Sequence, residues 1–289
     1  MQEQTGAVQS NDRAHRFDLH SHSNYSDGTA TPSEIVKSAF RAGLDLIALS
    51  DHDTIGGVKE AMETGEKLGI SVLPAVEMDN EWRHELHILG LDVDPDSPVL
   101  NRALEIARIR REKRNGVILQ KLDAAGIGVR DRINRPMECT SKLHIAIALV
   151  EAGLAKDIRD AFAKYLRQGQ VGFYQEPKFT PAQVLEIIHA ADGVPVLAHP
   201  CHIRDNPFAL INELTNLGLM GLEVYYPTST PRQTEMFLSI ARQKKLMVTC
   251  GSDFHGKNRP GVPLGCAWRD VPDLEQTYET LSRRIGTLR

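Results

Sequence analysis

Cysteine is scarce in this sequence, and no two cysteines have the close spacing of metal-binding or redox pairs. Cys139, Cys201, Cys250 and Cys266 are scattered through 289 residues and form no CxxC motif. Neither a disulfide scaffold nor a zinc ribbon is therefore indicated. We expect all four thiols to be reduced.

Long apolar runs and an excess of positive charge are also missing. No stretch approaches the roughly 18 to 20 apolar residues that cross a bilayer, and residues 1–16 are polar, without the apolar segment of a secretion signal. The 34 basic and 38 acidic residues give a formal net charge of −4, which argues against a protein that coats nucleic acid with its whole surface. We expect a cytoplasmic protein with no membrane contact and no stable protein partner.

Among the features that are present, the segment DLHSHSNYSDG, residues 18–28, carries the first recognisable chemistry. In an extended segment the side chains at positions i and i+2 lie on one face, so His20 and His22 can bind a single metal ion. Asp27 adds a carboxylate five residues later. An isolated pair of this kind also fits surface histidines ahead of a turn, so the rest of the chain must decide.

Short apolar runs alternate with amphipathic stretches at both ends of the chain, and 41% hydrophobic with 25% charged residues is ordinary for a globular protein. Strands are predicted over residues 16–20, 44–50, 70–77, 84–90, 194–199, 221–225 and 246–251. Helices are predicted over residues 32–42, 57–68, 181–191, 207–217 and 232–244. This βα rhythm indicates an α/β protein with a parallel sheet or barrel and a site at the strand ends.

The middle of the chain interrupts the alternation. Helical patterns follow one another over residues 104–126, 143–154 and 158–166 with no strand signal between them. We therefore expect a disordered tail over residues 1–16, a barrel domain formed by residues 17–94 and 182–289, and a helical insertion over residues 95–181. The insertion is a natural lid or substrate wall.

Residue types that bind metals recur where the predicted strands end: His52, Glu77, His87, His199, Asp253 and His255. Carboxylates and imidazoles without a thiolate select Mn²⁺, Zn²⁺ or Fe²⁺ over a structural zinc site. So many ligands are too many for one ion. Two or three divalent ions are expected, with Mn²⁺ favoured and Zn²⁺ or Fe²⁺ as alternatives.

The motifs DLHSHSNYSDG, SDHD, AHP and SDFH, together with Glu77 and His87, resemble those of the PHP (polymerase and histidinol phosphatase) superfamily of metal-dependent phosphoesterases. The resemblance covers the chain from Phe17 to about Gly265. It implies the family's distorted (β/α)7 barrel, whose strand number periodicity alone does not give. The segments LEVYYP, residues 222–227, and GSDFHG, residues 251–256, look like the stand-alone branch that carries a helical insertion.

Carried over position by position, the resemblance implies three groups of metal ligands: His20, His22, Glu77 and Asp253; Asp27, His52 and His255; and a bridging Glu77 with His87 and His199. Glu77, Asp253 and His255 are expected to be catalytic as well. The implied chemistry is attack of a metal-bridging hydroxide on a phosphate ester, whose developing charge the ions neutralise.

Members of the branch include a 3′,5′-nucleoside bisphosphate phosphatase and an exoribonuclease that trims short RNA from its 5′ end. The first expectation is therefore hydrolysis of a small nucleotide's phosphomonoester, above all the 3′-phosphate of pAp. A 5′→3′ exonuclease acting on short RNA or DNA is the alternative, and 6% aromatic residues slightly favour the small substrate. Two further alternatives are histidinol phosphatase activity and a non-catalytic metal-binding interaction module.

Substrate binding is expected in the insertion, at the start of the helix that follows Ser141, Lys142 and His144. A helix N-terminus with a cation and an imidazole is suited to an anion. The branch usually has Gly-Arg where this chain has Ser141-Lys142, and lysine loses the bidentate geometry of arginine. His144 is expected to contact phosphate, although packing within the helix is the alternative. In the basic run of residues 110–114 a solvated helix face is expected, with Arg114 as the exception that binds substrate.

Three further sets of residues have open roles. His84 competes with the favoured His87 as a ligand. Asp51 and Asp53 are candidates to orient His52. Tyr225 and Tyr226 could stack on a base or pack at the rim of the site.

Overall fold

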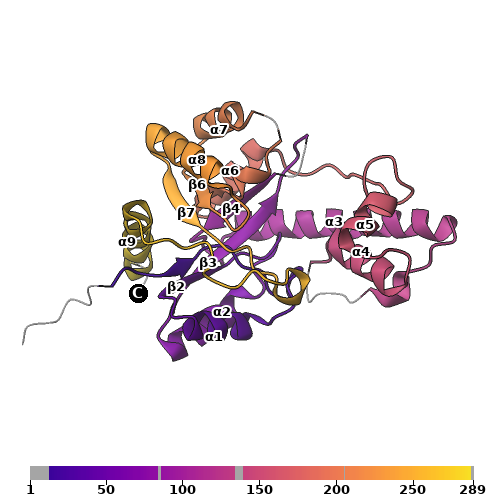
Figure 1. The fold of residues 1–289 in the computed structure, drawn as a ribbon, viewed down its shortest axis with the longest axis horizontal. Coiled ribbons are helices and arrows are strands. Elements are labelled where there is room, and N and C mark those ends of the chain that lie inside the picture. The colour runs from indigo at the N-terminus through magenta and orange to yellow at the C-terminus, as the bar shows by residue number, and fades with distance from the viewer. Residues whose placement is uncertain (1–12, 84–85, 134–138, 205, 288–289) are drawn as a thin grey trace, which may run out of the picture.

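The chain folds around a seven-stranded sheet that curls into a nearly closed barrel (Figure 1). The computed structural model describes residues 13–83, 86–133, 139–204 and 206–287. In sequence order the strands are β1 (Phe17–Asp18), β2 (Leu46–Leu49), β3 (Ser71–Asp79), β4 (His87–Leu91), β5 (Val194–Leu197), β6 (Gly221–Tyr225) and β7 (Met247–Cys250). Each strand pairs with its neighbour in sequence. Backbone hydrogen bonds from Leu19 to Cys250 (3.1 Å) and from Asp253 to His20 (2.9 Å) then join the first strand to the last.

The parallel pairing that the βα rhythm indicates is interrupted at one strand. β4 pairs antiparallel with both β3 and β5, whereas the other neighbouring pairs are parallel. A parallel pair needs a crossover of a dozen or more residues, and the connection from β3 to β4 is too short for one. As a result His87 lies at the beginning of its strand, and the reversal brings it to the same end of the barrel as Glu77.

Helices cover the outside of the barrel and form the insertion: α1 (Pro32–Arg41), α2 (Val58–Leu68), α3 (Pro98–Ala124), α4 (Lys142–Glu151), α5 (Ile158–Ala161), α6 (Pro181–Ala190), α7 (Pro207–Asn216), α8 (Pro231–Lys244) and α9 (Pro272–Thr287). Local sequence explains several of their starts. Thr31, Thr180 and Thr230 each form a capping box with proline directly after the cap, which fixes the first turn of α1, α6 and α8. The sequence analysis predicted every helix except α9.

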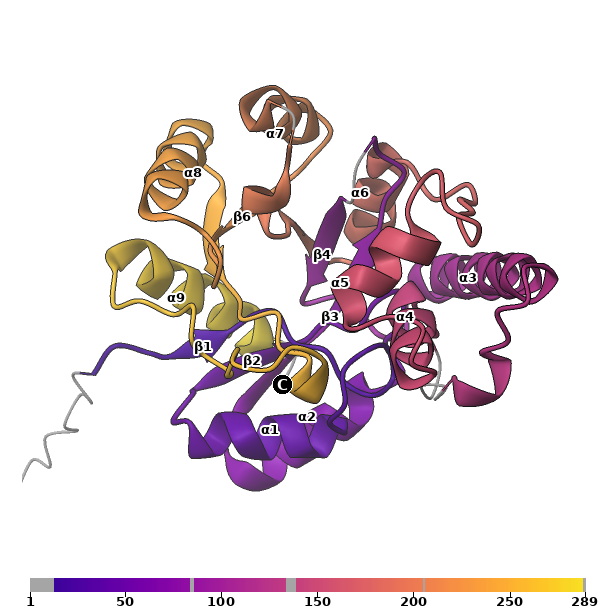
Figure 2. The same cartoon turned by 45° about the vertical axis from the view of Figure 1, so that its right-hand side comes forward.

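The insertion has a hydrophobic core of its own. The second half of α3 contributes Ile118 and Leu122, which pack with Ile145 and Leu149 of α4 and with the α5 region. The first half of α3 instead packs into the barrel core. Figure 2 shows α4 and α5 lying together against this long helix. Helix α3 thus contributes side chains to both cores. The domain limits drawn from the sequence stay predictions.

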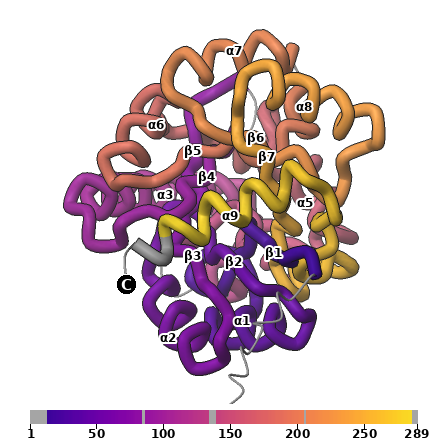
Figure 3. The backbone as a smooth tube through the Cα atoms, turned by 90° about the vertical axis from the view of Figure 1, so that its left-hand side faces the viewer, coloured from indigo at the N-terminus to yellow at the C-terminus, as the bar shows by residue number. Residues whose placement is uncertain are grey.

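The opposite side of the barrel is covered by α9, which crosses the strands away from the insertion (Figure 3). Part of the predicted tail is fixed there. The ring of His15 stacks on Tyr278 with centroids 4.0 Å apart, and its Nδ1 lies 2.6 Å from Oε1 of Glu275. The described chain therefore includes residues 13–16 of the predicted tail, and residues 1–12 lie outside the described part.

Two expectations about chemistry outside the site can be compared with the fold. All four cysteines are free thiols. Among the described residues, no helix is both long and apolar enough to cross a membrane.

Candidate metal centre

Four side chains from distant parts of the chain meet at the end of the barrel and form the first predicted ligand group. Nε2 of His20 lies 3.4 Å from Oε2 of Glu77 and 3.4 Å from Oδ1 of Asp253. Nε2 of His22 lies 3.2 Å from each of the same two oxygens. Both histidines are completely buried. The structure thus brings His20, His22, Glu77 and Asp253 together.

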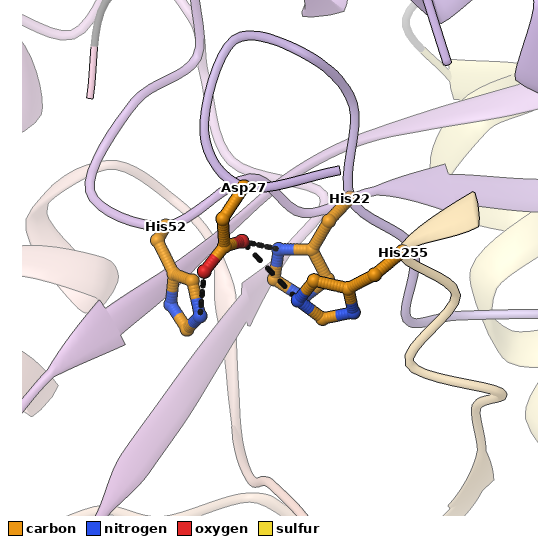
Figure 4. Close-up of side chains that lie close together, drawn as sticks. All are labelled: His22, Asp27, His52 and His255. Carbon is orange, nitrogen blue, oxygen red and sulfur yellow. Dashed lines mark ion pairs between the residues drawn. The ribbon is translucent and has the colours of Figure 1, made fainter. Parts of the chain in front are cut away.

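The second predicted group surrounds Asp27, as Figure 4 shows. Oδ1 of Asp27 lies 3.2 Å from Nε2 of His255, and Oδ2 lies 3.8 Å from Nε2 of His52. Nδ1 of His22 is 3.9 Å from Oδ1 of Asp27, so His22 borders this group as well as the first. The sequence analysis did not place His22 in both groups.

The third group forms on the other oxygen of Glu77. Nδ1 of His87 and Nε2 of His199 lie 2.9 and 3.0 Å from Oε1 of Glu77 and 3.2 Å from each other. The two nitrogens and this oxygen therefore form a compact triangle. His52 is an additional neighbour, because its Nδ1 is 3.0 Å from Oε2 of Glu77. His84, the rival of His87, lies outside the described residues.

These groups fit divalent ions in their spacing. Ligand atoms about 2.0 to 2.2 Å from one ion are roughly 3.0 to 3.5 Å apart when they hold adjacent positions. The nitrogen and oxygen pairs of the first and third groups span this range. Several of the nitrogens, moreover, have no aligned hydrogen bond although they are buried: Nε2 of His20, Nδ1 and Nε2 of His22, and Nδ1 of His52. Buried polar atoms without partners are costly, and metal ions would satisfy them.

The outward-facing nitrogens of three histidines support the same reading. Nδ1 of His20 faces Oε1 of Glu223 at 3.0 Å, and Nδ1 of His255 faces the carbonyl oxygen of Asp253 at 2.9 Å. Nε2 of His87 lies 2.7 Å from Oδ1 of Asp79. Because an acceptor fixes the proton on the outward nitrogen, the other nitrogen presents its lone pair to the centre. This is the tautomer that a metal ligand requires.

The carboxylates of the centre attract cations. Burial would lower the pKa of His22, but Asp253 and Glu77 raise it to about 9, and Glu77 and Asp79 raise the pKa of His87. Metal ions that bind here would displace these protons. Burial by itself would raise the pKa of Glu77, but His87, His52 and His20 together lower it well below its usual range. Burial lowers the pKa of His52 to about 3 against the opposing pull of Glu77 and Asp27. Glu77 is therefore ionised and His52 is neutral near pH 7, which are their ligating forms.

Strained backbone accompanies the site. His199 and Asp253 adopt positive φ angles of 30° and 54°. These lie in the left-handed region of the backbone, which residues other than glycine seldom adopt. Such residues persist where surrounding contacts hold them, and they gather at functional sites. Here the N–H of His199 donates to Oε2 of Glu223 at 2.7 Å, which secures that turn.

Several residues hold the candidate ligands in place, a role that the sequence analysis did not assign to them. Glu223 is completely buried. One of its carboxylate oxygens contacts the ring of His20, and the other accepts the backbone N–H of His199. Tyr226 donates its hydroxyl to Oδ2 of Asp253 at 2.7 Å, and Arg259 pairs with the same oxygen, which leaves Oδ1 for the histidines. A carboxylate inside the apolar strand GLEVY was the one signal that could have revealed Glu223.

Glycine is required beside this pair. A Cβ at Gly251 would lie 2.3 Å from Oε1 of Glu223 and 2.3 Å from Cβ of His20. No larger residue fits between these two side chains.

Some expected roles are corrected by the structure. Asp51 accepts hydrogen bonds from the backbone and hydroxyl of Ser23 and from the hydroxyl of Ser26, so it orders the loop before Asp27 instead of His52. Asp53 pairs with Arg111. Tyr226 is 5% exposed and is occupied by Asp253, which excludes it as a stacking surface for a base.

The predicted substrate residues lie at the start of α4. Ser141 caps the helix, and its backbone N–H donates to Nδ1 of His144 at 3.0 Å. Burial lowers the pKa of His144, against the opposing effect of Asp27 in the second group. Lys142 is partly exposed.

The basic run on α3 differs from the expected solvated face. Arg111 and Arg114 are 5% and 3% exposed. Nη1 of Arg114 lies 3.4 Å from Oε1 of Glu176, so much of its charge is already balanced. Arg110 lies over the ring of Phe179, 4.8 Å from its centroid. Lys113 is exposed to solvent, and Arg110 is partly exposed.

Comparison with known proteins gives a consistent assignment. The family model of the PHP domain matches residues 18–176. A 5′-3′ exoribonuclease of Haemophilus influenzae is 34% identical over 267 residues, which cover 89% of this chain and 93% of that protein. A 3′,5′-nucleoside bisphosphate phosphatase of Chromobacterium violaceum is 35% identical over 278 residues, which cover 93% and 97%.

A solved structure is similarly close. It is that of a Chromobacterium violaceum protein described as an amidohydrolase, with bound sulfate and no metal. The two chains are 33% identical and superpose with a TM-score of 0.83, over 93% of this chain and 96% of the other.

Proposed function

Because this chain belongs to the PHP family and is a metal-dependent phosphoesterase, we propose that it removes the 3′-phosphate of nucleoside 3′,5′-bisphosphates such as pAp. The ligand groups would hold two or three divalent ions, with Mn²⁺ favoured by the mixed imidazole and carboxylate donors. The relative that bears this activity in its name is matched over nearly its whole length.

The proposal is supported by a candidate anion site at the start of α4. Lys142 and His144 stand in the first turn of this helix, and the negative charge of Asp27 in the second ligand group acts on His144. A helix N-terminus and a cation both favour an anion. A substrate with two phosphates can therefore occupy both sites at once, whereas a monophosphate fills one.

The protein's own groups have defined tasks in this arrangement. Nδ1 of His144 accepts the N–H of Ser141, so the ring proton is on Nε2 and can be donated to a phosphate oxygen. Lys142 supplies a positive charge at the same helix start. Bound divalent ions would neutralise the phosphoryl oxygens and acidify a water molecule. The fixed tautomers of His20, His87 and His255 keep the ligand lone pairs directed inward.

Steady-state kinetics with Mn²⁺ on pAp, 5′-AMP, 3′-AMP, histidinol phosphate and a 5′-phosphorylated trinucleotide test the proposed substrate. We expect kcat/KM for pAp to exceed that for either monophosphate at least ~10-fold, because one additional charged hydrogen bond contributes about 1.5 to 3 kcal/mol. A trinucleotide preferred tenfold or more over pAp would overturn the choice.

Exonuclease action on short RNA is the second candidate. It is favoured by the similarity to the Haemophilus influenzae exoribonuclease, which is 34% identical and is covered over 93% of its length. The same anion site would then hold the second backbone phosphate of a strand. Successive release of nucleotides from the 5′ end of the trinucleotide, followed by chromatography, would distinguish this activity from removal of a terminal phosphate.

The pH dependence of binding provides a test of Lys142. Burial and the positive charges of Arg114 and Lys178 lower the pKa of Lys142 to about 8, against the opposing effect of Glu176 and Asp79. Lys142 is charged below that pH and loses its charge as the pH rises through it. We therefore expect KM for pAp to rise about tenfold between pH 7 and pH 9.5.

Lys142→Arg is the matched variant for this measurement. Arginine remains charged throughout the range, so the variant should show a flatter KM profile than the wild type. Effects of pH on the metal centre are common to both proteins and cancel in the comparison. Identical KM profiles would exclude Lys142 as the phosphate contact.

A further inference from the structure

A buried arginine of the insertion reaches the metal centre. Arg111 extends from α3 to the end of the barrel and is 5% exposed. Its Nε donates to Oδ2 of Asp53 at 2.7 Å, and its Nη2 lies 2.6 Å from the same oxygen and 2.9 Å from Oδ2 of Asp79. One guanidinium therefore bridges the residue that follows His52 and the last residue of β3.

The contact continues from Asp79 to a predicted metal ligand. Oδ1 of Asp79 lies 2.7 Å from Nε2 of His87, while Nδ1 of His87 faces Glu77 and His199. The two oxygens of Asp79 are thus divided between an arginine from the insertion and a histidine of the third group. This division fixes both the ring orientation and the tautomer of His87.

The charges explain why arginine is needed at this position. Asp53 is buried and the neighbouring Asp79 is partly buried, and the backbone N–H of Asp79 donates to Oδ1 of Asp53 at 3.3 Å. Like charges so close together repel and must be balanced. Nζ of Lys178 lies 3.2 Å from Oδ2 of Asp79 and balances part of this charge, but its side chain is 27% exposed and therefore partly screened by water. The planar guanidinium of Arg111 can serve both carboxylates from one place, which an ammonium does less well.

The same helix also places the substrate end of the site. One turn after Arg111, Nδ2 of Asn115 donates to the carbonyl oxygen of Thr140 at 2.9 Å, directly before the cap of α4. A short stretch of α3 therefore contacts the metal centre at Arg111 and the start of α4 at Asn115.

We propose that Arg111 is a positioning residue that couples the insertion to the third ligand group: it holds Asp79 so that His87 presents Nδ1 toward Glu77 and His199. The inference rests on the metal centre of the proposed function. Arg111 touches neither substrate nor metal in this role and acts through Asp79.

Manganese binding measures this role directly. Purified protein is stripped of metal, equilibrated with increasing Mn²⁺, and its bound metal is counted by mass spectrometry. We expect Arg111→Met to weaken one class of site about 10- to 100-fold, so that less Mn²⁺ is bound at low concentration and the wild-type content returns at high concentration. Arg108→Met on the same helix should bind as the wild type does, because the Arg108 side chain is 40% exposed and pairs with Glu112 across one turn.

Asp79→Asn separates this route from a general loss of folding. It leaves the contact between Arg111 and Asp53 in place and keeps an acceptor of the same shape near His87, so the fold should be retained. If Arg111 acts through Asp79, the double variant should lose no more Mn²⁺ affinity than the more severely affected of the two single variants.

The outcomes are distinct. Unchanged Mn²⁺ binding by Arg111→Met, or losses that multiply in the double variant, would overturn the role of Arg111. A wild-type protein that binds no divalent ion would instead overturn the proposed metal centre.

Discussion

Replacement of Glu77 by glutamine is expected to reduce kcat/KM at least ~10³-fold, a loss of about 4 kcal/mol of transition-state stabilisation. Oε2 of Glu77 faces His20 and His22, and Oε1 faces His87 and His199. This carboxylate is therefore the junction of the ligand groups. Glutamine keeps the shape, but it removes the negative charge and directs an N–H₂ group at imidazole lone pairs.

The Glu77→Gln variant should also bind less metal, since Glu77 belongs to more than one ligand group. Kinetics with pAp and metal content at equal Mn²⁺ concentration are the two measurements. Glu63→Gln, on the exposed face of α2, is the matched control and should leave both unchanged. Retention of more than a tenth of the wild-type kcat/KM by Glu77→Gln would contradict the central place of Glu77.

Removal of divalent ions is expected to abolish hydrolysis, again at least ~10³-fold, and added Mn²⁺ should restore it. Without ions, buried nitrogens of His20, His22 and His52 have no aligned partners. The metal-free protein should therefore also be less stable. Ions present at 100 times their dissociation constant stabilise the fold by about 2.7 kcal/mol, which corresponds to a rise in Tm of roughly 5 to 10 °C.

Chelation followed by assay and thermal unfolding checks both expectations, with metal content verified for each sample. Calcium is the control ion, because it prefers more oxygen ligands at longer distances than these groups supply. Calcium should therefore restore little activity. Full hydrolysis by verified metal-free protein would exclude the proposed chemistry.

The candidate ligands of the metal centre could be predicted from sequence because most of them stand in a local pattern. His20 and His22 share one face of a short extended segment, and the AHP and SDFH motifs directly follow apolar strands. The ends of successive strands in a barrel must meet, so the side chains that follow them must meet as well. This rule is independent of how the strands are packed in detail.

His87 shows the limit of that rule. The sequence analysis placed it at a strand end, but it begins β4, and only the antiparallel pairing with β3 and β5 brings it to Glu77. Strand direction depended on the length of a connection, which apolar periodicity does not report.

What the sequence by itself determined was the set of donor types, their order along the chain, and hence a metal-dependent phosphoesterase of the PHP family. Tertiary structure alone decided which charged groups became partners of those donors. Arg111 was expected on a solvated helix face, yet it is buried and pairs with Asp53 and Asp79. Glu223 forms contacts with two histidines, His20 and His199, that are distant from it in sequence. The physical reason is that a buried charge is tolerated only when an opposite group reaches it, and such a group is supplied by the way α3 and the strands pack together.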